Sequence, residues 1–125
     1  MFSSHNSERG RAGLAALRID SALVEVARQR AADMASTGYF AHASPSGQTA
    51  FTLLAGAGYR YGSAGENIAR NNYPDSQSVS VAMTGFMNSS THRYNIMDPG
   101  FSAVGIGAVT AQDGMKYYAV VFSDR

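Results

Sequence analysis

The stretch 102–122, SAVGIGAVTAQDGMKYYAVVF, decides the fold of this 125-residue chain. Two runs with the alternating pattern of β-strands flank residues 112–114, QDG, which favour a tight turn, so the stretch predicts a β-hairpin. Both alternating sets of side chains in the second run are apolar. They are Tyr117, Ala119 and Val121 on one face and Tyr118, Val120 and Phe122 on the other. A strand that is apolar on both faces must be covered on both, so we expect helices on two sides of the sheet.

The first run of the hairpin predicts a close neighbour on one of its faces. Val104, Ile106 and Ala108 point one way, whereas Gly105 and Gly107 lie on the opposite face. Glycines at these positions permit the close approach of another backbone. The hairpin as a whole therefore indicates a three-layer α/β/α sandwich.

The strongest helical pattern covers residues 19–38, IDSALVEVARQRAADMASTG. Asp20 is placed to act as the N-cap, and Gly38 suits the position just after the helix. The apolar residues form one stripe along this helix. They are Leu23, Val24, Ala27, Ala31, Met34 and Ala35. This helix is expected to lie on an apolar surface.

Weaker patterns predict the remaining elements. A polar helix is expected over Phe2–Arg11, a second helix over residues 48–57 and a third from Asp75 or Ser76 to about residue 90, with Asp75 placed as an N-cap. A short strand fits residues 66–69. Residues 90–100, STHRYNIMDPG, are interpreted as the loop that leaves the third helix.

Composition excludes several classes of function. The chain has no cysteine, which excludes disulfides, thiolate nucleophiles and cysteine-based metal sites. The formal charge is +1 with scattered basic residues, so nucleic acid is not expected as a partner. No apolar run approaches about 18 residues, and no signal peptide is recognisable at the start. With no repeat or linker, we expect a single domain over residues 1–125 and no transmembrane segment.

One acidic residue has no evident local role. Glu66 is one of nine acidic residues and lies in AGENIAR, residues 64–70, between Gly65 and Asn67. A glutamate suits neither a helix nor an exposed strand there. Two interpretations remain open: a buried carboxylate held by backbone N–H groups, or a member of a functional site.

The three histidines differ in their settings. His42 and His92 each lie in the turn expected just beyond a helix, where a scaffold commonly displays functional side chains, whereas His5 does not. Ser89 precedes His92 by three residues, on a neighbouring position of one helical face. The structural alternative is that His92 satisfies the last carbonyls of its helix and that His42 fixes a turn.

Taken together, six segments resemble the CAP superfamily of cysteine-rich secretory proteins, antigen 5 and pathogenesis-related 1 proteins. The order and spacing are those of its cysteine-free, bacterial SCP-like branch, and the resemblance covers essentially the whole chain. The segments are HNSERGRAGLAALRIDSAL (5–23), YFAH (39–42), QTAFTLLAGAGY (48–59), GENIA (65–69), SSTHRYNIMDPGFSAVGIG (89–107) and the closing hairpin. The resemblance implies an α+β fold: a three-layer α/β/α sandwich with a small, mainly antiparallel sheet flanked by helices.

The resemblance also implies a surface cleft. The two cleft histidines of the family fall on His42 and His92, and its first glutamate falls on Glu66. Its second glutamate falls on Ser89, three residues after Phe86, which replaces the usual tryptophan, so one carboxylate of the family site is missing. Four further residues match family positions and are expected to tie connectors down by hydrogen bonds: Asn6, Arg9, Asn67 and Asn95. The aromatic cluster of Tyr39, Phe40, Tyr59 and Tyr61 is expected in the core and at the cleft rim.

Two imidazoles and one carboxylate, where they converge, form a candidate metal site. His42, Glu66 and His92 would bind a divalent cation such as zinc, with water in the open position. Metal binding would weaken at acidic pH, because the ligands must be deprotonated. Glu66 lies 24 residues after His42 and 26 before His92, so only the resemblance brings the three together. No cofactor is required in this interpretation.

The first functional hypothesis is a secreted or cell-surface binding module, which follows from the resemblance. Its cleft, formed by His42, Glu66, Ser89 and His92, would take a small amphiphile, lipid or peptide. The second hypothesis is a hydrolase, in which Glu66 activates a metal-bound water, or His92 or His42 activates Ser89 or Ser44. The chain has no GxSxG nucleophile motif, which counts against the hydrolase. A third hypothesis is a structural coat or adhesion component.

Overall fold

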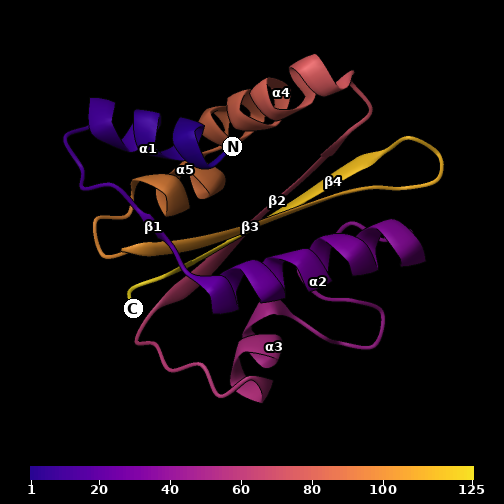
Figure 1. The fold of residues 1–125 in the computed structure, drawn as a ribbon, viewed down its shortest axis with the longest axis horizontal. Helices are drawn as coiled ribbons and strands as arrows, with labels where there is room; N and C mark the ends of the chain where they lie inside the picture. The colour runs from indigo at the N-terminus through magenta and orange to yellow at the C-terminus, as the bar shows by residue number, and fades with distance from the viewer.

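A computed structural model describes residues 1–125 as five helices and four strands in three layers (Figure 1). The helices are α1 (Phe2–Arg11), α2 (Ser21–Thr37), α3 (Ala50–Gly56), α4 (Asp75–Asn88) and α5 (Ser90–Met97). The strands are β1 (Arg18–Ile19), β2 (Ala64–Asn71), β3 (Ala103–Thr110) and β4 (Lys116–Ser123). This architecture confirms the α+β class and the α/β/α layering.

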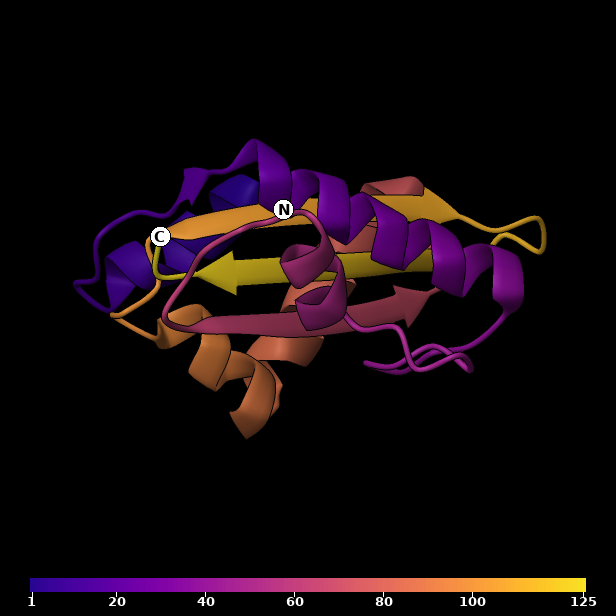
Figure 2. The same ribbon diagram turned by 90° about the horizontal axis from the view of Figure 1, so that it is seen from below.

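The sheet has the order β1-β3-β4-β2. The predicted hairpin is present, since β3 and β4 pair antiparallel from Ala103 opposite Ser123 to Thr110 opposite Lys116. Strand β2 adds antiparallel to the other side of β4, as Figure 2 shows. Only β1 runs parallel to its neighbour, and it pairs over two residues. The sheet is therefore small and mainly antiparallel, as expected.

Helix α2 lies directly on β3 because two glycines allow it. A Cβ atom on Gly105 would stand 2.1 Å from the carbonyl carbon of Leu23, and one on Gly107 would stand 2.4 Å from the carbonyl oxygen of Ala27. The ends of α2 are also as predicted. Asp20 accepts a hydrogen bond from the Ala22 N–H at 2.9 Å, and Gly38 closes the helix with φ 80°.

Each face of the sheet carries its own hydrophobic core. On one face α2 and α3 cover Tyr117, Ala119 and Val121. On the other face Val120 and Phe122 pack with residues of α4 and α5, and α1 lies on the same side (Figure 1). The alternation of β4 therefore has the predicted cause: each set of side chains faces a different layer.

The structure corrects the interpretation of residues 90–100. Residues 90–97 form α5, so His92 lies in the first turn of a helix and not in a loop beyond one. A single extended residue, Ser89 with φ −106° and ψ 123°, both ends α4 and begins α5. The sequence did not distinguish a helix from a loop here, because Ser and Thr favour helix N-caps as well as turns.

Two smaller expectations also change. Asp75 is the first residue of α4 and not its cap, a position taken by Pro74 without a side-chain hydrogen bond. The carboxylate is still favourable in the first turn because it faces the positive end of the helix dipole. The strand expected over residues 66–69 is longer and spans Ala64–Asn71, since its whole length pairs with β4.

Candidate functional site

Glu66 is buried in the middle layer, where it pairs with an arginine of α2. The Glu66 residue is 6% exposed, and its Oε2 accepts a hydrogen bond from Arg30 Nε at 2.9 Å, while Oε1 lies 3.4 Å from Arg30 Nη2. The side chains are 2% and 1% exposed, so this is a buried ion pair. A charge in this position requires a partner, because burial alone strongly disfavours it.

Each of the three guanidinium nitrogens of Arg30 has an acceptor. In addition to Glu66, Arg30 donates to the Tyr39 hydroxyl at 2.7 Å and to the Ala41 carbonyl oxygen at 2.6 Å. Burial lowers the pKa of Arg30, but the hydrogen bond and negative charge of Glu66 outweigh burial and leave this pKa above its usual value. Arg30 therefore ties the segment that carries His42 to the carboxylate on β2.

Sequence reasoning missed Arg30, although a signal was present. Arg30 follows Ala27 by three residues and precedes Met34 by four, so it falls on the apolar stripe of α2. It is the one charged residue on that buried face. Because a buried arginine needs an acceptor, its position on the stripe could have indicated a partner for Glu66.

His42 completes a chain of contacts that ends at the surface. Its Nδ1 lies 2.8 Å from Glu66 Oε1, while its side chain is 60% exposed. An ionised carboxylate only accepts hydrogen bonds, so Nδ1 carries the proton. In the neutral imidazole Nε2 is then left unprotonated. The structure thus brings together two of the predicted site residues, His42 and Glu66.

His92 and Ser89 form a second pair at the start of α5. His92 Nδ1 lies 2.7 Å from Ser89 Oγ, and the His92 ring stacks on Phe86 with the centroids 5.3 Å apart. Burial lowers the pKa of His92, and the electrostatic effect of the neighbouring His42 lowers this pKa further. His92 is therefore neutral at pH 7. It does not satisfy carbonyls at the end of α4.

Asparagines hold α5 against β2, and Asn67 and Asn95 thus have the tethering role expected of them. Asn67 donates to the carbonyl oxygen of His92 at 3.0 Å, and Asn95 donates to the side-chain oxygen of Asn67 at 2.9 Å. Gly65 leaves room for this contact, because a Cβ there would stand 3.0 Å from Asn95 Oδ1. These hydrogen bonds fix the His92 backbone relative to the strand that carries Glu66.

Ser44 has a local role in its turn. Its hydroxyl oxygen accepts a hydrogen bond from the Gln48 N–H at 3.0 Å and shares one with the Ser46 hydroxyl at 2.9 Å. Neither contact involves His42. Of the two serines considered as nucleophiles, only Ser89 is hydrogen-bonded to a histidine.

A groove of about 310 Å³ begins at Ser89 and His92. It runs over the apolar surfaces of Phe40 and Phe86, between β2 and α4. The Arg70 guanidinium covers the Phe40 ring at 4.8 Å from its centroid. The polar pair of His92 and Ser89 and the apolar groove are therefore continuous with each other.

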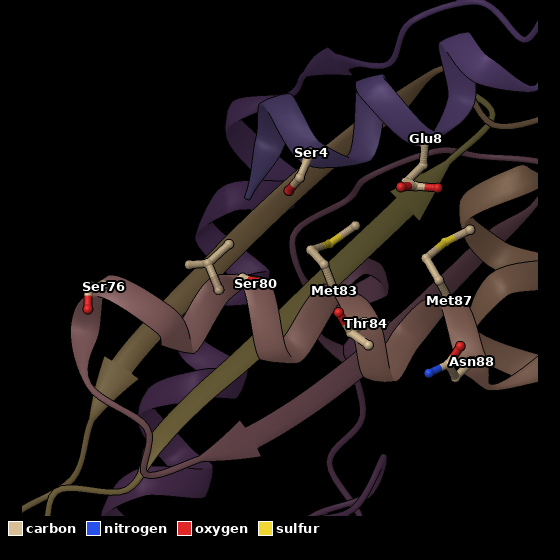
Figure 3. A pocket seen from close by; sticks show the side chains of 9 residues that line it. Ser4, Glu8, Ser76, Ser80, Met83, Thr84, Met87 and Asn88 are labelled. Atoms are coloured by element: carbon tan, nitrogen blue, oxygen red, sulfur yellow. The ribbon is translucent and has the colours of Figure 1, made fainter.

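A larger hollow of about 550 Å³ lies elsewhere, between α1 and α4. Figure 3 shows Met83 and Met87 of α4 directed towards α1, which contributes Ser4 and Glu8. None of the predicted site residues lines this hollow.

No three side chains of His, Cys, Asp or Glu stand close enough to hold a metal ion together. At Glu66 one oxygen faces Arg30 and the other faces both Arg30 and His42 Nδ1. A cation on this carboxylate would meet a guanidinium. The Nε2 atoms of His42 and His92 are the ligating atoms that these contacts leave free.

The fold defines a class of protein: α/β/α sandwiches with a small, mainly antiparallel sheet. Residues 2–122 match the family described as "Cysteine-rich secretory protein family", or CAP, and the chain belongs to it. No helix of the structure is long and apolar enough to cross a membrane.

Individual relatives agree with this assignment. The uncharacterized protein YkwD of Bacillus subtilis is 38% identical over 104 residues, which are 83% of this chain and 39% of that protein. The crystal structure of an extracellular protein containing a SCP domain from Bacillus anthracis is 31% identical, with a TM-score of 0.85 over 99% of this chain and 39% of the other. The chain thus spans about two fifths of these two relatives.

One more distant structure confirms the fold alone. An outer surface protein of Borrelia burgdorferi superposes with a TM-score of 0.88 at 18% identity, covering 99% of this chain and 89% of that one.

Proposed function

We propose that this domain is an extracellular or cell-surface binding module whose cleft takes a small amphiphile. The observation that carries the proposal is the continuity between the His92–Ser89 pair and the apolar groove over Phe40 and Phe86. A ligand would place its polar end at the imidazoles and its apolar part in the groove. A volume of about 310 Å³ is at the lower end of the range for small-molecule pockets. Relatives that carry this domain include proteins described as extracellular and as an outer surface protein.

A divalent cation such as zinc is an optional part of this proposal. The ion would take Nε2 of His42 and of His92 as ligands and would attract an anionic head group. Glu66 would stand behind His42, where a carboxylate that accepts the Nδ1–H orients a ligating histidine. This arrangement changes the role proposed for Glu66, from direct ligand to the group that orients His42.

The test is calorimetric titration with decanoate, a small anionic amphiphile. Gly85→Leu fills the groove, because Gly85 lines it and no heavy atom lies within 4 Å of its missing Cβ. We expect affinity for decanoate to fall at least tenfold. The control is Gly10→Leu on α1, a helical glycine that also has free space around it. Equal affinities in the two variants would refute binding in the groove.

A separate calorimetric titration with zinc tests the metal ion of this proposal. Zinc at neutral pH should bind the native protein and not His92→Ala. A native protein that releases no heat above buffer would remove the ion from the proposal, and decanoate binding would be unaffected.

A hydrolase is the second candidate, favoured by the 2.7 Å contact between Ser89 Oγ and His92 Nδ1. A neutral imidazole at that distance can accept the hydroxyl proton as a general base. The measurement is turnover of p-nitrophenyl decanoate by the native protein, Ser89→Ala and Glu66→Gln. Equal rates in all three would exclude both the serine and the glutamate from catalysis.

A further inference from the structure

The outer edge of β3 has no partner strand beyond Val104. Strand β1 pairs with Ala103 and Val104 only, and α2 then begins at Ser21. The N–H of Asp20 donates to the Val104 carbonyl at 3.1 Å, which shows the side to which that peptide group points. Peptide groups alternate along a strand, so the N–H and C=O of Ile106 and Ala108 point to the same edge. No backbone hydrogen bond from a turn, loop or helix cap reaches the N–H or C=O group of Ile106 or Ala108.

An apolar groove of about 480 Å³ runs beside this edge. Its lining includes Ile106 and Ala108 of β3, Phe2 of α1 and Val24 of α2. Helices α1 and α2 lie on opposite faces of the sheet (Figure 1). Ile19 of β1, which also lines the groove, is 57% exposed. Val24, which the sequence pattern placed in the core stripe of α2, is only partly buried because it borders this groove. Exposed apolar surface of this kind marks interaction sites.

Arg28 carries the one charged side chain that lines the groove. It is exposed on α2, and neither the hydrogen bonds nor the ion pairs of the structure provide it with an acceptor. An unpaired guanidinium at the rim of an apolar groove is complementary to a carboxylate. It also disfavours a second copy of this chain as the occupant, since that copy would bring another Arg28 to the same edge.

We propose that this edge binds an extended peptide segment with an acidic residue, which adds a fifth strand beside β3. The peptide backbone would pair with Ile106 and Ala108, alternate apolar side chains would enter the groove, and a carboxylate would contact Arg28. Strand addition suits this place because main-chain hydrogen bonds supply affinity and pockets for alternate side chains supply specificity. An amphiphile could fill the groove but would leave the peptide groups of the edge unpaired.

The first experiment selects peptides from a phage-displayed library of random nonapeptides on the native protein. Enriched peptides should alternate apolar residues and carry Asp or Glu, and their affinity is measured by fluorescence anisotropy. Ala108→Pro removes the outward N–H at a position where an edge strand tolerates proline, and it should weaken binding at least tenfold. Ala108→Val keeps the N–H at the same position, so a loss that is larger in Ala108→Pro than in Ala108→Val comes from the missing peptide hydrogen bond.

A matched pair of arginine variants tests the contact between Arg28 and the peptide carboxylate. Arg28→Ser should weaken the acidic peptides severalfold, whereas Arg60→Ser should not, because Arg60 is exposed in the loop before β2 and does not line the groove. Equal losses in both variants would overturn the contact with Arg28.

Hydrogen exchange tests the strand without any substitution, so it remains decisive if Ala108→Pro does not fold. The amides of Ile106 and Ala108 should exchange faster than those of Gly105 and Gly107 in the free protein. They should become protected when a selected peptide is added. The proposal is overturned if no peptide is enriched, if bound peptides leave both amides unprotected, or if decanoate gives the same protection.

Discussion

Replacing Arg30 by methionine should destabilise this protein far more than the same replacement of an exposed arginine. Both side chains of the Arg30–Glu66 pair are almost completely buried, and Arg30 Nε lies 2.9 Å from Glu66 Oε2. Arg30→Met leaves the Glu66 carboxylate buried with His42 as its one remaining side-chain partner. Breaking a buried ion pair from one side costs about 3–5 kcal/mol of unfolding free energy. For a chain of this size that lowers Tm by roughly 10–20 °C.

The double variant Arg30→Met/Glu66→Gln separates the ion pair from the lost packing. With the carboxylate gone, most of the loss should be recovered, because a neutral amide needs no counter-charge. Arg28→Met is the matched control, two residues away on the exposed face of α2, and should stay within about 0.5 kcal/mol of the native protein.

The assay is urea unfolding followed by circular dichroism at pH 7. A single variant that loses less than about 1 kcal/mol would contradict the reasoning. A double variant that is less stable than Arg30→Met would do the same, because it would show that the carboxylate is not the source of the cost.

Three further predictions concern the layers around the site. Gly105→Ala should lower the unfolding free energy by about 1–3 kcal/mol in the same assay, because its Cβ would stand 2.1 Å from the Leu23 carbonyl carbon. Gly85→Ala should not lower it, because no heavy atom lies within 4 Å of the new Cβ. Burial lowers the pKa of His5, so stability should be full above its unfolded pKa of about 6.5 and be lost as the pH falls through 6.5 towards the folded value. His5→Leu should flatten that dependence in urea unfolding between pH 7.5 and 5; an unchanged slope would contradict it. Asn67→Ala removes two hydrogen bonds that hold α5 and should cost about 1–3 kcal/mol, with faster amide exchange in α5.

The predicted fold followed from one strand because the two faces of β4 leave few arrangements. A run that is apolar on both faces needs two covering layers, and Gly105 and Gly107 indicated the face that a neighbouring backbone approaches closely. The structure shows that this neighbour is α2. These signals are local in the chain, so they could be recognised without the structure. The break at Ser89 was not recognised, because one extended residue between two helices has the same composition as a loop.

The site, like the fold, was only partly predictable from the sequence. Sequence identified Glu66 as a carboxylate without a local role, and the resemblance to the CAP family selected His42 and His92. The sequence could not show that Glu66 pairs with Arg30, which lies 36 residues earlier in another layer. It also could not show that His92 contacts Ser89 at the start of α5.

The sequence by itself therefore determined the layers, the hairpin and the family, since these depend on periodicity and on motifs that are contiguous in the chain. Only the tertiary structure decided the partners of each charge. A buried carboxylate is neutralised by whichever donor the packing of helix on sheet brings within about 3 Å, and no local pattern fixes that distance. The opposing positions of Arg30 and Glu66 follow from the close contact of α2 with the sheet.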